Sequence, residues 1–213
     1  MPTLRPATKD DAATIVALMD MASHGMARAL WASLTPPGED PETFALNRAQ
    51  RDTGGFSYRN TRILMAEGCP AGMIMCWTLP PEPLPIHDLP ATARPLVELE
   101  NLAPRRALYI NALAVFPAFR RRGLARLMLA EAGQGPQALI AAAPRNPVPG
   151  PPRDLPACLE EAPDQVRGGV TPPEVALALY HAAGFTETAR RPAQGDAHWQ
   201  PDFPDWLLLT RTA

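Results

Sequence analysis

The chain has few cysteines, no long apolar run and no excess of charge of one sign, and each absence excludes a class of protein. Its three cysteines, Cys69, Cys76 and Cys158, are odd in number and form no CxxC pair. This argues against a disulfide framework and favours free thiols in a reducing compartment. No segment approaches the ~18 uncharged apolar residues of a membrane span, and no apolar run follows the N-terminus as in a signal peptide. We therefore expect no membrane association and a cytoplasmic location.

The charge distribution gives no reason to expect nucleic acid as a partner. The formal net charge is −2 and charged residues make up 20% of the chain, with no stripe in which basic and aromatic residues interleave. A solvated surface of mixed sign is the favoured interpretation. His24, His181 and His198 have no mutual spacing typical of metal ligands, so no metal site is expected.

The 27 prolines are the anomaly of the composition, and their placement is informative. They gather at 80–95 and 144–173 and avoid the segments that resemble strands. This pattern favours an ordered core with two stiff excursions over a disordered chain. We expect a single domain spanning residues 1–213, with a proline-rich insertion at about 144–170.

Periodicity and turn signals predict strands and helices that alternate in the middle of the chain, with hairpin-like pairs on either side. The expected strands are 3–5, 62–67, 71–78, 107–115, 137–143, 186–191 and 206–211. The expected helices are an amphipathic one that starts at Thr8 and keeps apolar positions through Met26, then 41–51, a short one after Pro95, 123–132 and 175–183. The order indicates an α/β or α+β fold of three layers around one mixed sheet.

The segment 107–125 carries the most specific chemical pattern. A nearly all-apolar strand ends at Pro117, a basic turn follows, and a helix begins near Gly123. The first turn of a helix has unpaired backbone N–H groups and the positive end of the dipole, so it binds phosphate well. Gly123 lets the backbone approach a pyrophosphate closely, and the arginines at 120–122 offer charge-assisted contacts. Three arginines in a turn are also typical of a solvated surface, so the pattern alone has moderate specificity.

Three motifs in this chain resemble those of the GNAT N-acetyltransferase superfamily, and they occur in the family's order. Arg120-x-x-Gly123-x-Ala125 matches the signature (Gln/Arg)-x-x-Gly-x-(Gly/Ala), and 113–117 resembles the end of the family's fourth strand. Residues 176–185 are similar to the A-x-x-L-Y-x-x-x-G-F helix and turn. The opening segment 4–11 resembles the family's first strand and helix.

The resemblance implies a GNAT-like three-layer fold whose central sheet is mixed, mostly antiparallel, and splayed between strands 4 and 5. It further implies that acetyl-CoA binds as co-substrate, with pantetheine between the splayed strands. The residues that would bind it are Leu113 and Val115, through backbone groups, and Arg120, Arg121, Arg122, Gly123, Leu124 and Ala125 at the pyrophosphate.

The resemblance also implies an N-acetyltransferase in which a primary amine attacks the thioester directly. Tyr180 matches the tyrosine whose hydroxyl protonates the departing thiolate. The alternative interpretation is that Tyr180 is a packing residue with no role in the reaction. Phe56 and Tyr58 lie in the loop where the family places acceptor-binding residues. The interpretation of this loop as a glycine hinge with an aromatic anchor is equally favoured. The acceptor would be a small-molecule or peptide amine, and the protein a monomer or homodimer.

Two departures from the family pattern leave a second function open. Asn111 stands where many relatives carry a carboxylate that takes the amine's proton, and an amide cannot act as a base. Glu98, Glu100 and His87 could substitute, but each is favoured as a solvated surface residue, so water is an open alternative and the base stays unassigned. Asn111 itself is expected to bind the acceptor. Pro173 and the preceding insertion also depart from the family. The alternative is a non-catalytic CoA or acyl-CoA sensor of the same fold.

Overall fold

The computed structural model of the protein describes residues 1–133, 136–142 and 173–212. The chain forms two compact units. The first comprises the described residues of Met1–Cys76 and Ala112–Ala132, and the second those of Trp77–Asn111, Gly133–Val148 and Thr171–Ala213. The insertion expected at 144–170 lies outside the described residues, and the expectation of a single domain stays a prediction.

The described residues form one seven-stranded mixed sheet with the order β1-β2-β3-β4-β5-β7-β6. β4 and β5 are parallel, whereas β1–β2, β2–β3, β5–β7 and β6–β7 are antiparallel. This confirms the mixed α/β fold class predicted from the sequence. The strands are β1 Thr3–Pro6, β2 Thr61–Ala66, β3 Cys69–Thr78, β4 Leu108–Val115, β5 Gln137–Ala142, β6 Thr186–Pro192 and β7 Asp205–Arg211.

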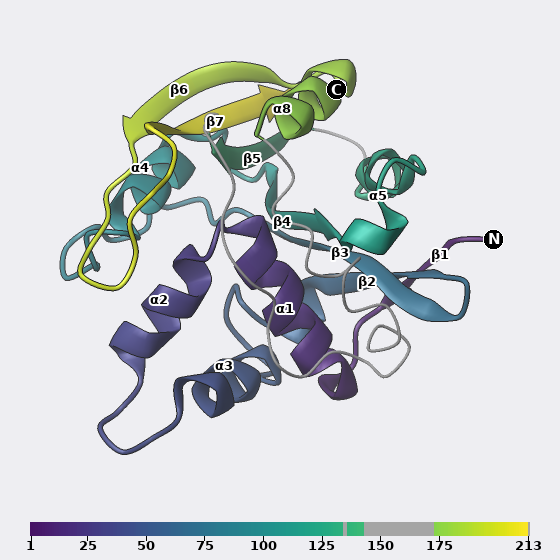
Figure 1. Cartoon of the computed structure of the whole chain (residues 1–213). Coiled ribbons are helices and arrows are strands. Elements are labelled where there is room, and N and C mark those ends of the chain that lie inside the picture. Colours follow the sequence, from purple (N-terminus) through teal and green to yellow (C-terminus); the bar gives the residue numbers. More distant parts are fainter. Residues whose placement is uncertain (134–135, 143–172, 213) are drawn as a thin grey trace. The chain divides into compact units, whose positions relative to one another are not determined.

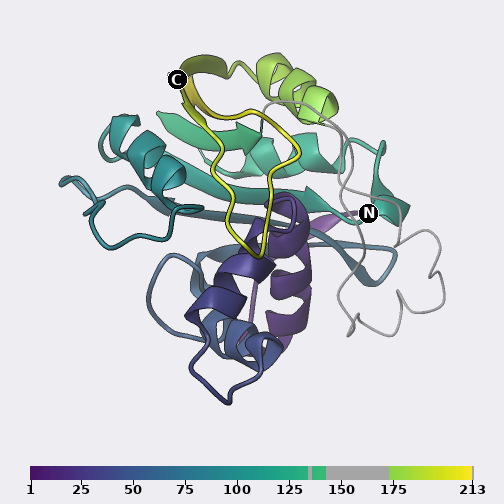
Figure 2. The same ribbon diagram turned by 60° about the vertical axis from the view of Figure 1, so that its left-hand side comes forward.

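In the first unit, α1 (Ala12–Ala22), α2 (Met26–Leu34) and α3 (Pro41–Ala49) pack against one another, as Figure 2 shows. The prediction of one helix continuing through Met26 is wrong, because the chain turns at His24 and Gly25, whose φ angles are 56° and 81°. The carboxylate of Asp20 accepts the N–H of Arg28 at 3.2 Å and so caps the start of α2. Met26 is buried on the far side of the break, so the apolar pattern continues although the helix does not.

The β2–β3 hairpin fixes the geometry of the strand that leads to the candidate site. Its two turn residues, Glu67 and Gly68, have φ angles of 56° and 80°, as a type I′ turn requires. Further along β3, a Cβ on Gly72 would lie 2.5 Å from the carbonyl oxygen of Ala114. Only glycine permits this approach of β3 to β4, so Gly72 sets the position of the end of β4.

In the second unit, α4 (Arg94–Leu102) packs on β5, β6 and β7, and α8 (Pro173–Ala182) contacts β5 (Figure 1). The parallel register pairs residues Leu108 to Ile110 of β4 with Gln137 to Leu139 of β5, and over the described residues the two strands pair only at these positions. Leu99 of α4 and Leu209 of β7 are fully buried in this core. None of the helices in the described ranges is both long and apolar enough to cross a membrane.

Candidate functional site

The turn after β4 has a backbone that glycine alone adopts easily. A short 3-10 helix, η3 (Pro117–Phe119), ends at Arg120, and α5 (Leu124–Glu131) begins after Gly123. Arg121 and Gly123 have left-handed φ angles of 60° and 75°. A Cβ placed on Gly123 would meet no atom within 4 Å, so this face of the turn opens onto free space. The turn therefore leads into α5 with its backbone accessible.

The backbone N–H groups of this turn have no acceptors within the part of the chain that the structure describes. Among the described residues, none of the N–H groups of residues 121–125 donates a hydrogen bond, whereas Leu127 N–H donates to the Gly123 carbonyl at 3.0 Å. These donors lie at the start of α5, where the helix dipole is positive. The arrangement can bind an anion such as a phosphate or pyrophosphate.

The three arginines of the turn differ in what they contact. Arg120 is half-buried; its Nε donates to the Val115 carbonyl at 3.0 Å and its Nη2 lies 3.2 Å from Met21 Sδ. Arg122 pairs with Glu67 at 2.6 Å and also donates to the Ala118 carbonyl at 3.1 Å. Within the described chain, Arg121 makes no ion pair or side-chain hydrogen bond and is exposed. Arg120 and Arg122 thus hold the turn in place, and Arg121 has a guanidinium available for a ligand.

Leu113 and Val115, predicted to bind pantetheine, lie on one face of β4 with Asn111, which is predicted to bind the acceptor. These three residues are partly exposed, and the alternating Ala112 and Ala114 are buried. The Val115 carbonyl already accepts the hydrogen bond from Arg120, which leaves its second lone pair. The face can offer backbone groups to an extended ligand from Leu113 onward.

Tyr180 occupies the C-terminal end of α8, in the second unit. Phe185 N–H donates to the Tyr180 carbonyl and Gly184 N–H to the His181 carbonyl, both at 3.0 Å, with Gly184 at φ 86°. This is a Schellman motif, in which the side chains at the positions of Tyr180 and Phe185 usually touch. Their ring centroids are 6.3 Å apart in an edge-to-face arrangement. The spacing between Tyr180 and Gly184-Phe185 is therefore explained by helix capping and packing.

The hydroxyl of Tyr180 is the part of the residue that packing does not explain. It makes no hydrogen bond to another residue of the described ranges. Burial raises the pKa of Tyr180 to about 12, so the phenol is protonated at neutral pH. A protonated hydroxyl without an acceptor is suited to donate to a ligand, and the acid role assigned to it stays a prediction.

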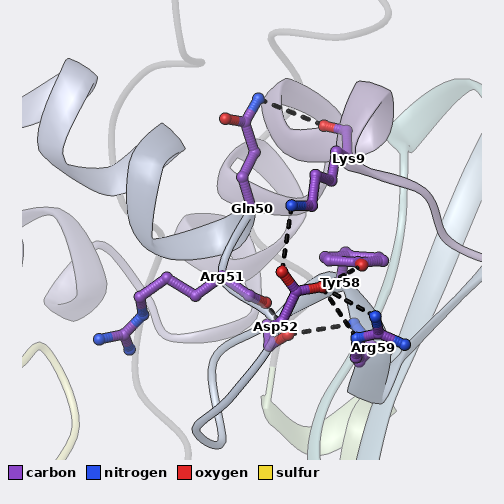
Figure 3. A network of polar contacts seen from close by, with 7 residues as sticks. Lys9, Gln50, Arg51, Asp52, Tyr58 and Arg59 are labelled. Atoms are coloured by element: carbon purple, nitrogen blue, oxygen red, sulfur yellow. Dashed lines mark hydrogen bonds and ion pairs between the residues drawn. The ribbon is translucent and has the colours of Figure 1, made fainter.

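Phe56 and Tyr58 are engaged within the first unit. The Phe56 ring packs on Trp31, with centroids 5.3 Å apart. Tyr58 donates its hydroxyl to Asp52 at 2.6 Å (Figure 3). The same carboxylate accepts bonds from Lys9 at 3.1 Å and Arg59 at 3.0 Å, which ties the loop to the 3-10 turn that precedes α1. These contacts favour the anchor interpretation over an acceptor pocket built from the two rings.

The expectation that Glu100 is a solvated surface residue is wrong. Glu98 is partly exposed and pairs with Arg191 at 3.1 Å, but Glu100 is only 8% exposed. Burial raises the pKa of Glu100 to about 7, and the positive charge of Arg105 opposes this shift. The signal was present in the sequence, because Leu96, Leu99, Glu100 and Ala103 lie at the i, i+3, i+4, i+7 spacing of one helix face.

The described residues contain no group of three or more His, Cys, Asp or Glu side chains that could hold a metal ion.

Comparison with known proteins adds a family and a fold. Residues 24–134, more than half of the chain, match the acetyltransferase (GNAT) family, and this range includes the turn and α5 but not Tyr180. No curated protein matches the chain.

Many solved structures match the fold at low sequence identity. An N-acetyltransferase from Staphylococcus aureus Mu50 is 15% identical, with 98% of this chain and 99% of that chain covered and a TM-score of 0.51. The loading GNATL domain of CurA from Lyngbya majuscula is 16% identical, with 100% and 98% covered and a TM-score of 0.55. PH1933 from Pyrococcus horikoshii OT3 is 11% identical, with 100% and 99% covered and a TM-score of 0.52. Because residues 24–134, more than half of its length, match the family and its fold is shared with these structures, the chain belongs to the acetyltransferase (GNAT) family.

Proposed function

We propose that the protein is an acetyl-CoA-dependent N-acetyltransferase that acetylates a primary amine of a small molecule or peptide. The observation that carries the proposal is the run of N–H groups at residues 121–125, at the start of α5, which have no acceptor among the described residues. Membership of the acetyltransferase (GNAT) family supplies the donor that such an anion site would bind.

Acetyl-CoA would bind with its pyrophosphate at the turn. The N–H groups of residues 121–125 would donate to the phosphate oxygens, and Arg121 would add a charge-assisted contact because its guanidinium is not otherwise engaged. Gly123 leaves room for the phosphates, since its missing side chain faces open space. The pantetheine amides would pair with backbone groups of Leu113 and Val115.

In the transfer step, the amine would attack the thioester carbonyl and Tyr180 would protonate the departing sulfur. The pKa of about 12 keeps Tyr180 protonated throughout the pH range of an assay. It also makes the phenol a weak acid relative to a thiol, whose ordinary pKa is about 8.5. We therefore expect its contribution to lie near the lower end of the ~10²–10⁴-fold range of general acids.

The donor site is tested by Gly123→Glu, which places a bulky, negatively charged side chain where the pyrophosphate would lie. Acetyl-CoA binding, measured by calorimetry, should be lost. Gly38→Glu is the matched control, because Gly38 also has a left-handed φ (88°) and open space around its Cβ position. It adds the same strain and charge away from the turn and should leave binding unchanged. Wild-type affinity in Gly123→Glu would show that the donor binds elsewhere.

A screen for CoA release across classes of amines tests the transfer itself. The wild type should release CoA with at least one class of primary amine. A protein that binds acetyl-CoA but releases no CoA with any amine would instead be a CoA or acyl-CoA sensor, for which Asn111 in place of a carboxylate is the specific argument.

A further inference from the structure

An arginine of β7 holds the turn that ends α8. Arg211, the last residue of β7, donates from its Nη1 to the Ala183 carbonyl at 2.9 Å. Its guanidinium also lies over the Phe185 ring, with 5.0 Å between Cζ and the ring centroid. A cation at the C-terminus of a helix interacts favourably with the last carbonyl groups and with the dipole. A hydrogen bond and a cation–π contact therefore tie β7 to this turn.

A buried glutamine fixes the direction of the Arg211 guanidinium. Gln137 lies opposite Arg211 in the register of β5 and β7 and is fully buried. Its Oε1 accepts from Arg211 Nη2 at 2.8 Å, and its Nε2 donates to the Gly133 carbonyl at 2.8 Å. Because its amide nitrogen is engaged by Gly133, Gln137 presents its oxygen to Arg211. The planar guanidinium is thus held by Gln137 through Nη2 and by Ala183 through Nη1.

The ring of Tyr180 depends on this turn for its direction. Its hydroxyl makes no hydrogen bond to another described residue, so no polar contact within the described ranges fixes the ring. The ring instead packs edge to face on Phe185, with centroids 6.3 Å apart. Phe185 is 1% exposed and carries the Arg211 guanidinium on its ring. A shift of the Phe185 ring would therefore move the ring of Tyr180 and the oxygen that it carries.

We propose that Arg211 is a positioning residue that directs the hydroxyl of Tyr180 toward the thioester sulfur. This inference rests on the proposed function, in which Tyr180 protonates the departing thiolate. Arg211 would act through Ala183 and Phe185, without contact with either substrate. Proton transfer needs the two heavy atoms within about 2.6–3.2 Å of each other, and a displacement of about 1 Å can cost ~10²-fold in rate. The contacts of Arg211 therefore matter to the rate as well as to the fold.

The alternative role for Arg211 is a cap that only stabilises the end of α8. Both roles predict a less stable protein when Arg211 is replaced, so stability does not separate them. They differ once the hydroxyl of Tyr180 has been removed. A residue that acts through this hydroxyl then has no further effect on kcat, whereas a residue that only stabilises the fold has the same effect with or without the hydroxyl. A double-mutant cycle on kcat separates the two roles.

The cycle compares the wild type, Arg211→Met, Tyr180→Phe and the double variant, at a temperature at which unfolding curves show all four folded. Methionine keeps a flexible apolar chain against Phe185 and removes the charge and the donors. Arg211→Met alone should lower kcat by ~10-fold, less than the ~10²-fold expected on loss of the hydroxyl, and should lower it no further in the Tyr180→Phe background. Acetyl-CoA affinity, measured by calorimetry, should stay at the wild-type value in all four proteins.

Two single variants complete the experiment. Arg211→Lys keeps the charge but loses the planar fork that bonds Gln137 and Ala183 together, so it should recover part of the lost kcat. Arg190→Met is the matched control, because Arg190 lies on the neighbouring strand β6 and its ion pairs are with Glu187 at 2.7 Å and Asp205 at 3.5 Å. It loses the same charge from a strand of the same sheet and should keep the wild-type kcat.

Each outcome decides the assignment. A wild-type kcat in Arg211→Met, or an equal loss with and without the hydroxyl of Tyr180, would overturn the positioning role and leave the proposed function standing. If Arg211→Met does not fold, Arg211→Lys takes its place in the cycle, and the same two outcomes would overturn the proposal. A wild-type kcat in Tyr180→Phe would refute the acid, and the positioning role with it. A wild type that binds acetyl-CoA but releases no CoA with any amine would refute the transferase function itself.

Discussion

Replacing Glu100 by glutamine should stabilise the protein at alkaline pH and leave its stability unchanged at acidic pH. The pKa of Glu100 is raised from an ordinary 4.5 to about 7 in the folded protein, chiefly by burial. Between these values the unfolded chain releases the proton first, so the free energy of unfolding falls as pH rises. This loss of unfolding free energy is complete above about pH 7 and absent below about pH 4.5. At 1.36 kcal/mol per pKa unit, the ionised carboxylate costs about 3 kcal/mol.

The assay is thermal or urea unfolding of the wild type and Glu100→Gln at pH 4 and at pH 8.5. At pH 4 the carboxyl is neutral in both states, so glutamine is a close isostere and the two proteins should unfold together. At pH 8.5 the variant should be about 3 kcal/mol more stable, or roughly 6–12 °C in Tm for a chain of this size. Glu98→Gln is the control, since a partly exposed ion pair contributes only ~0–1 kcal/mol. An equal difference at both pH values would mean that the effect is packing and that Glu100 ionises normally.

Two further predictions concern the site and the strand that leads to it. Tyr180→Phe should lower kcat by ~10²-fold while acetyl-CoA affinity stays at the wild-type value, because only the hydroxyl is lost and the ring still packs on Phe185. If steady-state kinetics of this variant give an unchanged kcat, Tyr180 is a packing residue and not the acid. Gly72→Ala should cost about 1–3 kcal/mol in unfolding free energy and weaken acetyl-CoA binding, because its Cβ would lie 2.5 Å from the Ala114 carbonyl oxygen. Wild-type stability of this variant in an unfolding experiment would contradict the close approach of β3 to β4.

The parts of the fold that local rules determine were predictable from the sequence. Asp40 followed by Pro41 predicted the start of α3, and in the structure the Asp40 carboxylate accepts the Thr43 N–H at 2.9 Å. The strand, the Pro117 stop and the Gly123 helix start likewise appear as β4, η3 and α5. In each case the signal and the structure it specifies lie within a few residues of each other.

The parts that depend on tertiary contacts were not predictable in the same way. The break between α1 and α2 is set by the Asp20 carboxylate capping a helix that starts six residues later, and the buried Met26 disguises it. Which arginines of the turn remain available depends on Val115, Met21 and Glu67, and Met21 and Glu67 are distant in sequence. Composition and spacing carry no information about such partners.

Tyr180 shows where a motif ceases to be evidence for chemistry. A helix that ends in a Schellman motif favours glycine at position 184 and an apolar contact between the side chains at positions 180 and 185. The hydrogen bonds from Phe185 and Gly184 and the edge-to-face rings meet both requirements. The spacing would therefore be kept by a phenylalanine at position 180 as well as by a tyrosine. What capping cannot account for is the hydroxyl, which has no acceptor among the described residues and a pKa of about 12. An acid role for Tyr180 therefore depends on one oxygen atom, and Tyr180→Phe tests that role because it removes this atom and leaves the cap intact.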